Sequence, residues 1–181
     1  TGVPLALMDC SLITAIRTSL VSAILVRECA KQNAKSALII GSGTQGKFAI
    51  PSLLTCNPNI ETIGVFGNYP DSVAEIIKTA ALNYPDKTFF IANNLQNAVE
   101  TSDIIIAVAG PSTPNLAQES WIKPGTLMIL VGYGIEAAAL HKADRVVTTS
   151  ASQMKVTGID LIDENGNLPH PHAELHEILL K

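Results

Sequence analysis

The stretch "SALIIGSGTQGKFAI" (residues 36–50) decides the fold of this chain. Residues 36–41 form an apolar run typical of a buried strand, and residues 45–57 have a helical pattern that Pro51 is expected to kink or delay. Between them lies G-x-G-x-x-G, in which Gly41 would allow a tight turn, Gly43 a close approach to a pyrophosphate, and Gly46 close helix–strand contact. The stretch favours a dinucleotide-binding loop, and a plain glycine turn is the alternative.

Apolar runs and helical patterns alternate along the rest of the chain, which predicts an α/β fold with a doubly wound, mostly parallel, six-stranded sheet. Further strands are expected at 60–67, 87–93, 103–110, 126–132 and 144–150, and helices at 71–83, 94–102, 135–143 and from about Ala173. A long linking helix with a broad apolar stripe is expected over 11–32, where the stripe comprises Leu12, Ile13, Ile16, Leu20, Ile24, Leu25 and Val26.

The composition limits the partners. The 181 residues are 47% hydrophobic and 15% charged, with a net charge of −4 and no basic block, so neither nucleic acid nor a membrane is an expected partner. Three scattered cysteines indicate neither a disulfide framework nor a zinc site, and we expect a cytoplasmic protein. His170, His172 and His176 are expected to lie in a solvated tail, and no metal site is predicted. The opening "TGVPLALMD" resembles a strand that arrives from elsewhere, as in a piece of a longer chain.

The end of the second strand does not settle which cofactor would bind. An acidic residue about 20 positions after the glycine loop would normally hold the ribose 2′-hydroxyl, and here Gly67 and Asn68 occupy that place. No arginine stands there for a 2′-phosphate. The expectation is NAD or NADP, with a lean toward NAD.

Five segments in order resemble motifs of the ornithine cyclodeaminase/mu-crystallin family. They are "LITAIRTSLVSAI", "IIGSGTQGKF", "TSDIIIAVAGPSTPNL", "WIKPGTLMILVGYG" and "HKADRVVTTSASQ", and together they cover roughly residues 4–155. The resemblance implies hydride transfer with NAD(H) or NADP(H) on a small amino acid or cyclic imine. It divides the chain into the end of a substrate and dimerisation domain with a linking helix (1–32), a Rossmann-like domain (33–155), and a segment returning to the substrate domain (156–181). A homodimer of the full-length protein is implied as one option.

The resemblance also implies which residues contact the cofactor. Arg17 and Thr18 match the family's "RT", near the cofactor phosphates or the substrate carboxylate, where a guanidinium suits either. The positions carried over along the remaining motifs are Gly41, Gly43, Thr44, Gln45 and Gly46 at the pyrophosphate, Gly67 and Asn68 at the ribose, Ala107, Val108 and Ala109 beside the adenosine half, and Val131, Gly132, Tyr133 and Gly134 under the nicotinamide.

The sequence departs from the family at Gly134, where cyclodeaminases carry an acid/base aspartate. Glu136 is the nearest acid, and a helix N-terminus would also attract it. The catalytic residue is therefore unknown from sequence. Two interpretations stay open: an NAD(P)-dependent oxidoreductase or cyclodeaminase-like protein, and a non-catalytic dinucleotide-binding protein that lost the aspartate. An NAD-sensing domain of an unrelated regulator is a third.

Overall fold

The structure is a computed structural model that describes residues 2–113 and 116–180. Its helices are α1 (Ser11–Cys29), α2 (Thr44–Cys56), α3 (Pro70–Asn83), α4 (Leu95–Thr101), α5 (Ala137–His141), α6 (Ala151–Thr157) and α7 (Leu175–Leu179), with 3₁₀ turns η1 (Glu119–Trp121) and η2 (Ile159–Leu161). Its strands are β1 (Ser36–Ile40), β2 (Thr62–Phe66), β3 (Thr88–Ile91), β4 (Ile104–Ala107), β5 (Leu127–Leu130), β6 (Val147–Thr148) and β7 (Ala173–Glu174).

The main sheet has five parallel strands in the order β3-β2-β1-β4-β5. The central strand is β1, in which Ala37 lies between Ile63 of β2 and Ile104 of β4. The chain winds outward from β1 to β3 and then crosses back to β4, so the strand order reverses beside β1. The predicted α/β, doubly wound, parallel fold is confirmed, and a crevice is expected at the carboxyl ends of β1 and β4.

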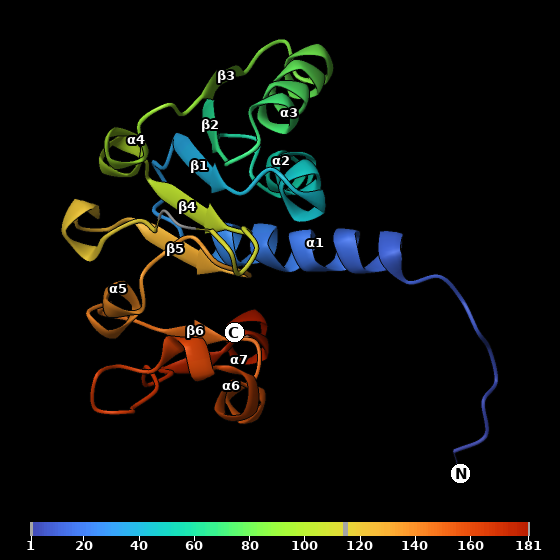
Figure 1. Ribbon diagram of the computed structural model, residues 1–181, viewed down its shortest axis with the longest axis vertical. Helices are drawn as coiled ribbons and strands as arrows, with labels where there is room; N and C mark the ends of the chain where they lie inside the picture. The colour runs from blue at the N-terminus through green and yellow to red at the C-terminus, as the bar shows by residue number, and fades with distance from the viewer. Residues whose placement is uncertain (1, 114–115, 181) are drawn as a thin grey trace.

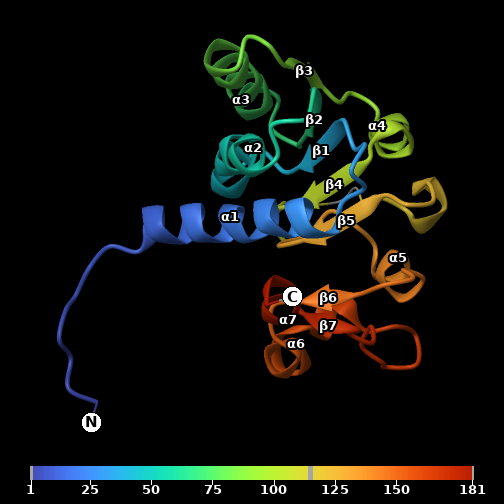
Figure 2. The same ribbon diagram turned by 180° about the vertical axis from the view of Figure 1, so that it is seen from behind.

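Helices cover both faces of this sheet (Figure 1, Figure 2). Alternate side chains of β1 point to opposite faces, so Ile39 belongs to one core cluster and Leu38 to the other. The cluster around Ile39 includes residues of α1, α2 and α3, whereas the cluster around Leu38 includes residues of α4 and α5. Because both faces are buried, β4 is apolar throughout and β1 is apolar from Ala37 onward.

The predicted sixth strand of this sheet is wrong. Residues 144–150 contribute only β6, which pairs with β7 in a separate two-stranded parallel sheet. Val146 and Val147 are the only large apolar residues of that segment, which is too few for a strand buried on both faces. Helix α6 was not predicted, and the final helix begins at Leu175, after β7.

Helix α1 buries Val26 of the predicted stripe, and its other buried residues lie outside that stripe. Its buried residues are Ala15, Ser19, Ser22, Ala23 and Val26, mostly small side chains that allow a close approach to α2. Leu12, Ile13 and Ile16 are instead exposed. Figure 1 shows α1 as a long helix beside the sheet, with residues 2–10 extending away from it. Among the described residues, no helix is both long and apolar enough to cross a bilayer.

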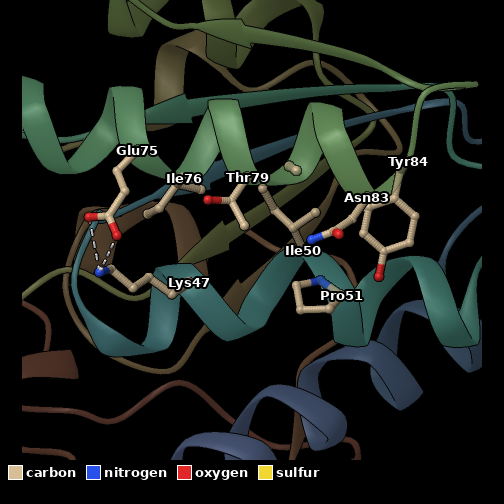
Figure 3. A pocket seen from close by; sticks show the side chains of 9 residues that line it. Lys47, Ile50, Pro51, Glu75, Ile76, Thr79, Asn83 and Tyr84 are labelled. Carbon is tan, nitrogen blue, oxygen red and sulfur yellow. Dashed lines mark hydrogen bonds and ion pairs between the residues drawn. The ribbon is translucent and has the colours of Figure 1, made fainter.

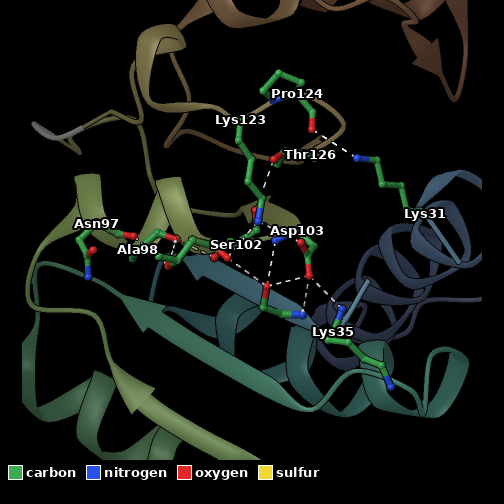
Figure 4. Close-up of polar contacts among 11 residues, drawn as sticks. Lys31, Lys35, Asn97, Ala98, Ser102, Asp103, Lys123, Pro124 and Thr126 are labelled. Atoms are coloured by element: carbon green, nitrogen blue, oxygen red, sulfur yellow. Dashed lines mark hydrogen bonds and ion pairs between the residues drawn. The ribbon is translucent and has the colours of Figure 1, made fainter. Parts of the chain in front are cut away.

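The carboxylate of Asp103 links the amino ends of β1 and β4 through hydrogen bonds (Figure 4). Asp103, just before β4, accepts hydrogen bonds from the backbone N–H groups of Lys35 (2.9 Å) and Ser36 (3.1 Å) and from the Ser36 hydroxyl (2.9 Å). The Lys123 ammonium lies 3.0 Å from its other oxygen. Burial alone would raise the pKa of Asp103, but these hydrogen bonds outweigh it and hold the pKa well below its ordinary value. This network lies at the opposite end of the strands from the glycine loop.

Candidate functional site

The glycine loop between β1 and α2 has a separate structural reason for each glycine. Gly41 has a φ of +126°, and a Cβ there would lie 2.7 Å from the backbone nitrogen of Ala109. A Cβ at Gly46 would collide with the carbonyl oxygen of Gly41. At Gly43 a Cβ would meet nothing within 4 Å. Two glycines therefore let the backbone fold tightly, and the third faces open space.

A groove of about 200 Å³ opens above this loop, at the carboxyl ends of β1, β2 and β4. It is lined by Ile40, Gly41, Ser42, Gly43, Phe66, Gly67, Asn68, Tyr69, Ser72, Val108, Ala109, Gly110 and Thr113. No carboxylate and no cationic side chain is among these lining residues. The groove therefore offers backbone donors, hydroxyls and one amide to a ligand.

The start of α2 fits a diphosphate. Its N-cap, Gly43, lines the groove and provides no side-chain hydrogen bond, so no side-chain cap satisfies the first N–H groups of this 13-residue helix. Ser42 is 6% exposed and, within the described part of the chain, its hydroxyl oxygen has no hydrogen-bond partner. Sequence reasoning missed Ser42, because the middle residue of G-x-G has no fixed role. The open space at Gly43 and the uncapped helix suit the pyrophosphate of a nicotinamide dinucleotide.

The predicted ribose end lies where β2 leaves the sheet. A Cβ at Gly67 would lie 2.6 Å from the Ser42 hydroxyl oxygen, so the glycine lets the two loops come together. Asn68 and Tyr69 follow, both exposed, and Ser72 lies in the first turn of α3. These side chains can hydrogen-bond ribose hydroxyls without bringing a charge.

Helix α1 reaches the start of α2 through one polar contact. The hydroxyl of Ser19, which is 4% exposed, lies 3.2 Å from the side-chain oxygen of Gln45. Thr18 is half-buried and Arg17 is exposed, both immediately before Ser19. The structure thus brings the residue that follows the "RT" segment to the first turn of α2. Ser19 was not predicted from sequence, because nothing in the helical pattern shows that it faces Gln45.

The predicted nicotinamide end is formed by the segments that follow β4 and β5. Ala109 and Tyr133 exchange two backbone hydrogen bonds, of 3.0 and 2.9 Å. Ala109 lines the groove, whereas the side chain of Ala107 is fully buried and is not presented to a ligand. Val131 is partly exposed and Gly132 approaches the Ala109 carbonyl.

Gly134, at the position of the family aspartate, cannot carry a side chain without strain. Its φ is +136°, and a Cβ there would lie 2.7 Å from Cγ2 of Ile40 and 3.1 Å from Cβ of Ala107. Glu136 is the N-cap residue of α5, and its carboxylate accepts a hydrogen bond from the backbone N–H of Glu119. That bond links the loop before α5 to the 3₁₀ turn η1.

Tyr133 meets a carboxylate that sequence reasoning did not single out. Its hydroxyl donates to Oδ2 of Asp160 in η2 at 2.6 Å, and this hydrogen bond raises the pKa of the phenol. The two residues are 27 positions apart, so only the fold reveals the pair.

Two other features carry no predicted site residue. A second groove, of about 170 Å³, lies between α2 and α3 and has the Lys47–Glu75 ion pair (3.2 Å) at one end (Figure 3).

In the C-terminal segment, Nδ1 of His172 accepts a hydrogen bond from the Val146 backbone. Within residues 2–113 and 116–180, no three His, Cys, Asp or Glu side chains are arranged to hold a metal ion.

A parallel sheet with a reversed strand order and a glycine loop at its carboxyl edge places this chain in the Rossmann-like class of α/β folds. The chain belongs to the ornithine cyclodeaminase/mu-crystallin family, whose sequence model matches residues 1–178.

Relatives in this family share modest identity with the chain. It is 27% identical over 154 residues to N-((2S)-2-amino-2-carboxyethyl)-L-glutamate dehydrogenase of Staphylococcus aureus, covering 84% of this chain and 46% of that protein. It is 28% identical over 179 residues to a Delta(1)-pyrroline-2-carboxylate reductase of Colwellia psychrerythraea, covering 96% and 54%. The chain thus spans about half the length of the curated relatives it matches.

Solved structures show the same architecture. The Thermococcus litoralis Delta(1)-pyrroline-2-carboxylate reductase, solved with NADH and L-proline, superposes with a TM-score of 0.78 at 27% identity, covering 99% of this chain and 58% of that one. An archaeal alanine dehydrogenase with bound NAD also has a TM-score of 0.78, at 21% identity and with 99% and 57% coverage, and shows the fold alone.

Proposed function

We propose that this chain carries the NAD(P)-binding part of an oxidoreductase that acts on a small amino acid or imine. The observation that carries the proposal is the groove above an uncapped α2, with Gly43 facing open space. Bound there, a nicotinamide dinucleotide would supply or accept a hydride. The relatives named for reduction of an imino acid, and for dehydrogenation of an amino-acid derivative, support the same chemistry.

Different residues along the groove would then contact different parts of the cofactor. The N–H groups of Thr44 and Gln45 would hold the diphosphate, and Asn68 would hydrogen-bond the ribose. Arg17, which is exposed and lies two residues before Ser19 in α1, is proposed to grip a phosphate or a substrate carboxylate. Val131 and Gly132 would lie against the nicotinamide. We propose the division at 32 and 155 as the boundaries of the cofactor-binding part.

Deamination by the cyclodeaminase route is disfavoured by Gly134, because that position has no room for an acid. The same observation favours the second candidate, a dinucleotide-binding protein without catalysis. Reduction of an imine does not require an acidic side chain at position 134, since an imine nitrogen can take its proton from solvent.

Titration of the 181-residue chain with NADH and NADPH, followed by nicotinamide fluorescence, tests the site. Saturable binding with a Kd below about 100 µM, corresponding to about −5.5 kcal/mol, is expected. Turnover of a panel of cyclic imines and amino acids tests the activity separately. Binding without turnover of any of them would favour the second candidate, and no binding of either nucleotide would overturn the proposal.

A further inference from the structure

Tyr69 places an aromatic ring on the wall of the groove. It is the most exposed aromatic side chain of the chain, at 72%, and Phe90 is next at 37%. The face of such a ring is a flat apolar surface on which a nucleotide base stacks. Pro70 follows directly and restricts Tyr69 to extended backbone, with φ −115° and ψ 93°. A ring carried by a restricted backbone loses less entropy when it binds a ligand.

The other side of the groove leaves room for a flat base. It is formed by the residues that follow β4, among them Val108 and Gly110. Because β1 lies between β2 and β4, the two sides are two strand spacings apart, about 10 Å. A Cβ at Gly110 would meet nothing within 4 Å, so the space beside it is open. A purine ring therefore fits between the two sides.

The part of the groove around Tyr69 carries no charge that would read a 2′-phosphate. Its lining residues there are Gly67, Asn68, Tyr69 and Ser72, all neutral at pH 7. Lys47, the only cation of α2, lies 3.2 Å from Glu75 and lines the other groove. The residues that line this end can therefore neither attract nor repel the phosphate strongly.

The start of α3 acts on a 2′-phosphate in two opposite directions. The N-cap of this helix makes no side-chain hydrogen bond, so the partial positive charge of its first turn is available to an anion. Asp71 lies in the same turn and repels an anion. Because the two effects oppose each other, neither form of the cofactor gains a large advantage from α3.

We propose that Tyr69 stacks on the adenine of the cofactor, and that this aromatic contact, in place of charge, makes the chain bind NAD(H) and NADP(H) with similar affinity. The inference rests on the proposed dinucleotide site and deepens it. It names Tyr69 as the residue that recognises the base, and it assigns the ligand class of this end of the groove as an adenylate with or without a 2′-phosphate.

The test measures dissociation constants for NADH and NADPH. In wild type the two should agree within about fivefold, and Tyr69→Ala should raise both by roughly fivefold to a hundredfold, the range for loss of one base–aromatic stack. Tyr69→Phe keeps the ring and should bind both nucleotides like wild type. Etheno-ADP, whose base fluorescence is quenched by stacking, should be quenched by wild type and Tyr69→Phe but not by Tyr69→Ala.

Leu82→Ala is the matched control, because Leu82 is 75% exposed on the same helix and does not line the groove. It should change no dissociation constant. Unchanged affinities in Tyr69→Ala would overturn the inference and leave the proposed site standing. It would also be overturned by a Tyr69→Phe protein as weak as Tyr69→Ala, or by wild-type affinities that differ more than about fivefold. Failure of wild type to bind either nucleotide would overturn the proposed function first.

Discussion

The Ser19 hydroxyl of α1 donates to the side-chain oxygen of Gln45, the second residue of α2, across 3.2 Å. The contact links the middle of α1 to the first turn of the helix that follows the glycine loop. With its oxygen engaged, the Gln45 amide has its N–H₂ group available for a phosphate oxygen.

Ser19→Ala is expected to weaken NADH binding by about fivefold, the equivalent of one neutral hydrogen bond of about 1 kcal/mol. The unfolding midpoint should change little, because alanine fills the same small space. Ser22→Ala is the matched control, since Ser22 is equally buried but bonds only to the Thr18 carbonyl within its own helix. A Kd that does not differ between the two variants would contradict the role given to Ser19.

Gly43→Ala is expected to weaken NADH binding without changing the stability of the fold. Its Cβ would project into open space, so the free energy of unfolding measured in urea should stay within about 0.5 kcal/mol of wild type. The affinity for NADH should fall at least about tenfold. Gly46→Ala should instead destabilise the fold, because its Cβ would collide with the Gly41 carbonyl. Unchanged NADH affinity in Gly43→Ala would place the diphosphate elsewhere.

Gly134→Asp, which restores the family residue, is expected to cost about 2–3 kcal/mol of unfolding free energy, from positive-φ strain and contact with Ile40. Urea denaturation followed by circular dichroism measures it. Gly110→Ala is the control, because its Cβ would meet nothing within 4 Å. A Gly134→Asp protein as stable as wild type would show that this turn adapts to a side chain.

Asp103→Asn is expected to lower the unfolding free energy by about 2 kcal/mol at pH 7, because hydrogen bonds to a charged acceptor are lost. The pKa of Asp103 is depressed in the folded state, so its contribution is complete above the unfolded-state pKa of about 4 and is lost as the pH falls below that value. The variant should therefore lose less stability than wild type between pH 4 and pH 2.

Asp86→Asn provides the comparison for that experiment. Asp86 is exposed, and its nearest partner is the adjacent Lys87 at 3.4 Å, so its removal should change neither the midpoint nor the pH dependence measurably. Identical acid unfolding of wild type and Asp103→Asn would contradict the role of the network.

Asn68→Asp is expected to increase the preference for NADH over NADPH by at least about tenfold, because a carboxylate accepts from the ribose 2′-hydroxyl and repels a 2′-phosphate. Comparison of the two Kd values measures the preference. Asp71→Asn, in the first turn of α3, serves as a control for a general charge effect. An unchanged ratio in Asn68→Asp would mean that the ribose lies elsewhere.

The parallel core was predictable from sequence because its signals are local. Strand β4 and residues 37–40 of β1 are unbroken apolar runs, and the glycines at 41, 43 and 46 follow a fixed spacing. The sixth strand was wrong because "DRVVTTS" is β-prone locally but has too few apolar residues to be buried on both faces.

The polar pairs of the site could not be predicted. Ser19–Gln45 and Tyr133–Asp160 join residues 26 and 27 positions apart, and neither position carries a pattern that identifies its partner. The same holds for α1, where close contact with α2 selects small residues over the larger ones that periodicity favoured. Periodicity identifies the apolar face of a helix, whereas the distance between two helices decides which side chains fit between them.

The extended segment before α1 has a consequence for handling the protein. Val3, Leu5 and Leu7 are each more than 60% exposed and alternate along the chain, as the side chains of a strand do. Exposed apolar side chains in an extended segment can pair with strands of other molecules and promote aggregation. The protein should therefore aggregate as its concentration rises, which light scattering would measure. Replacing Leu5 and Leu7 with lysine should suppress this aggregation without changing the affinity for the nucleotide.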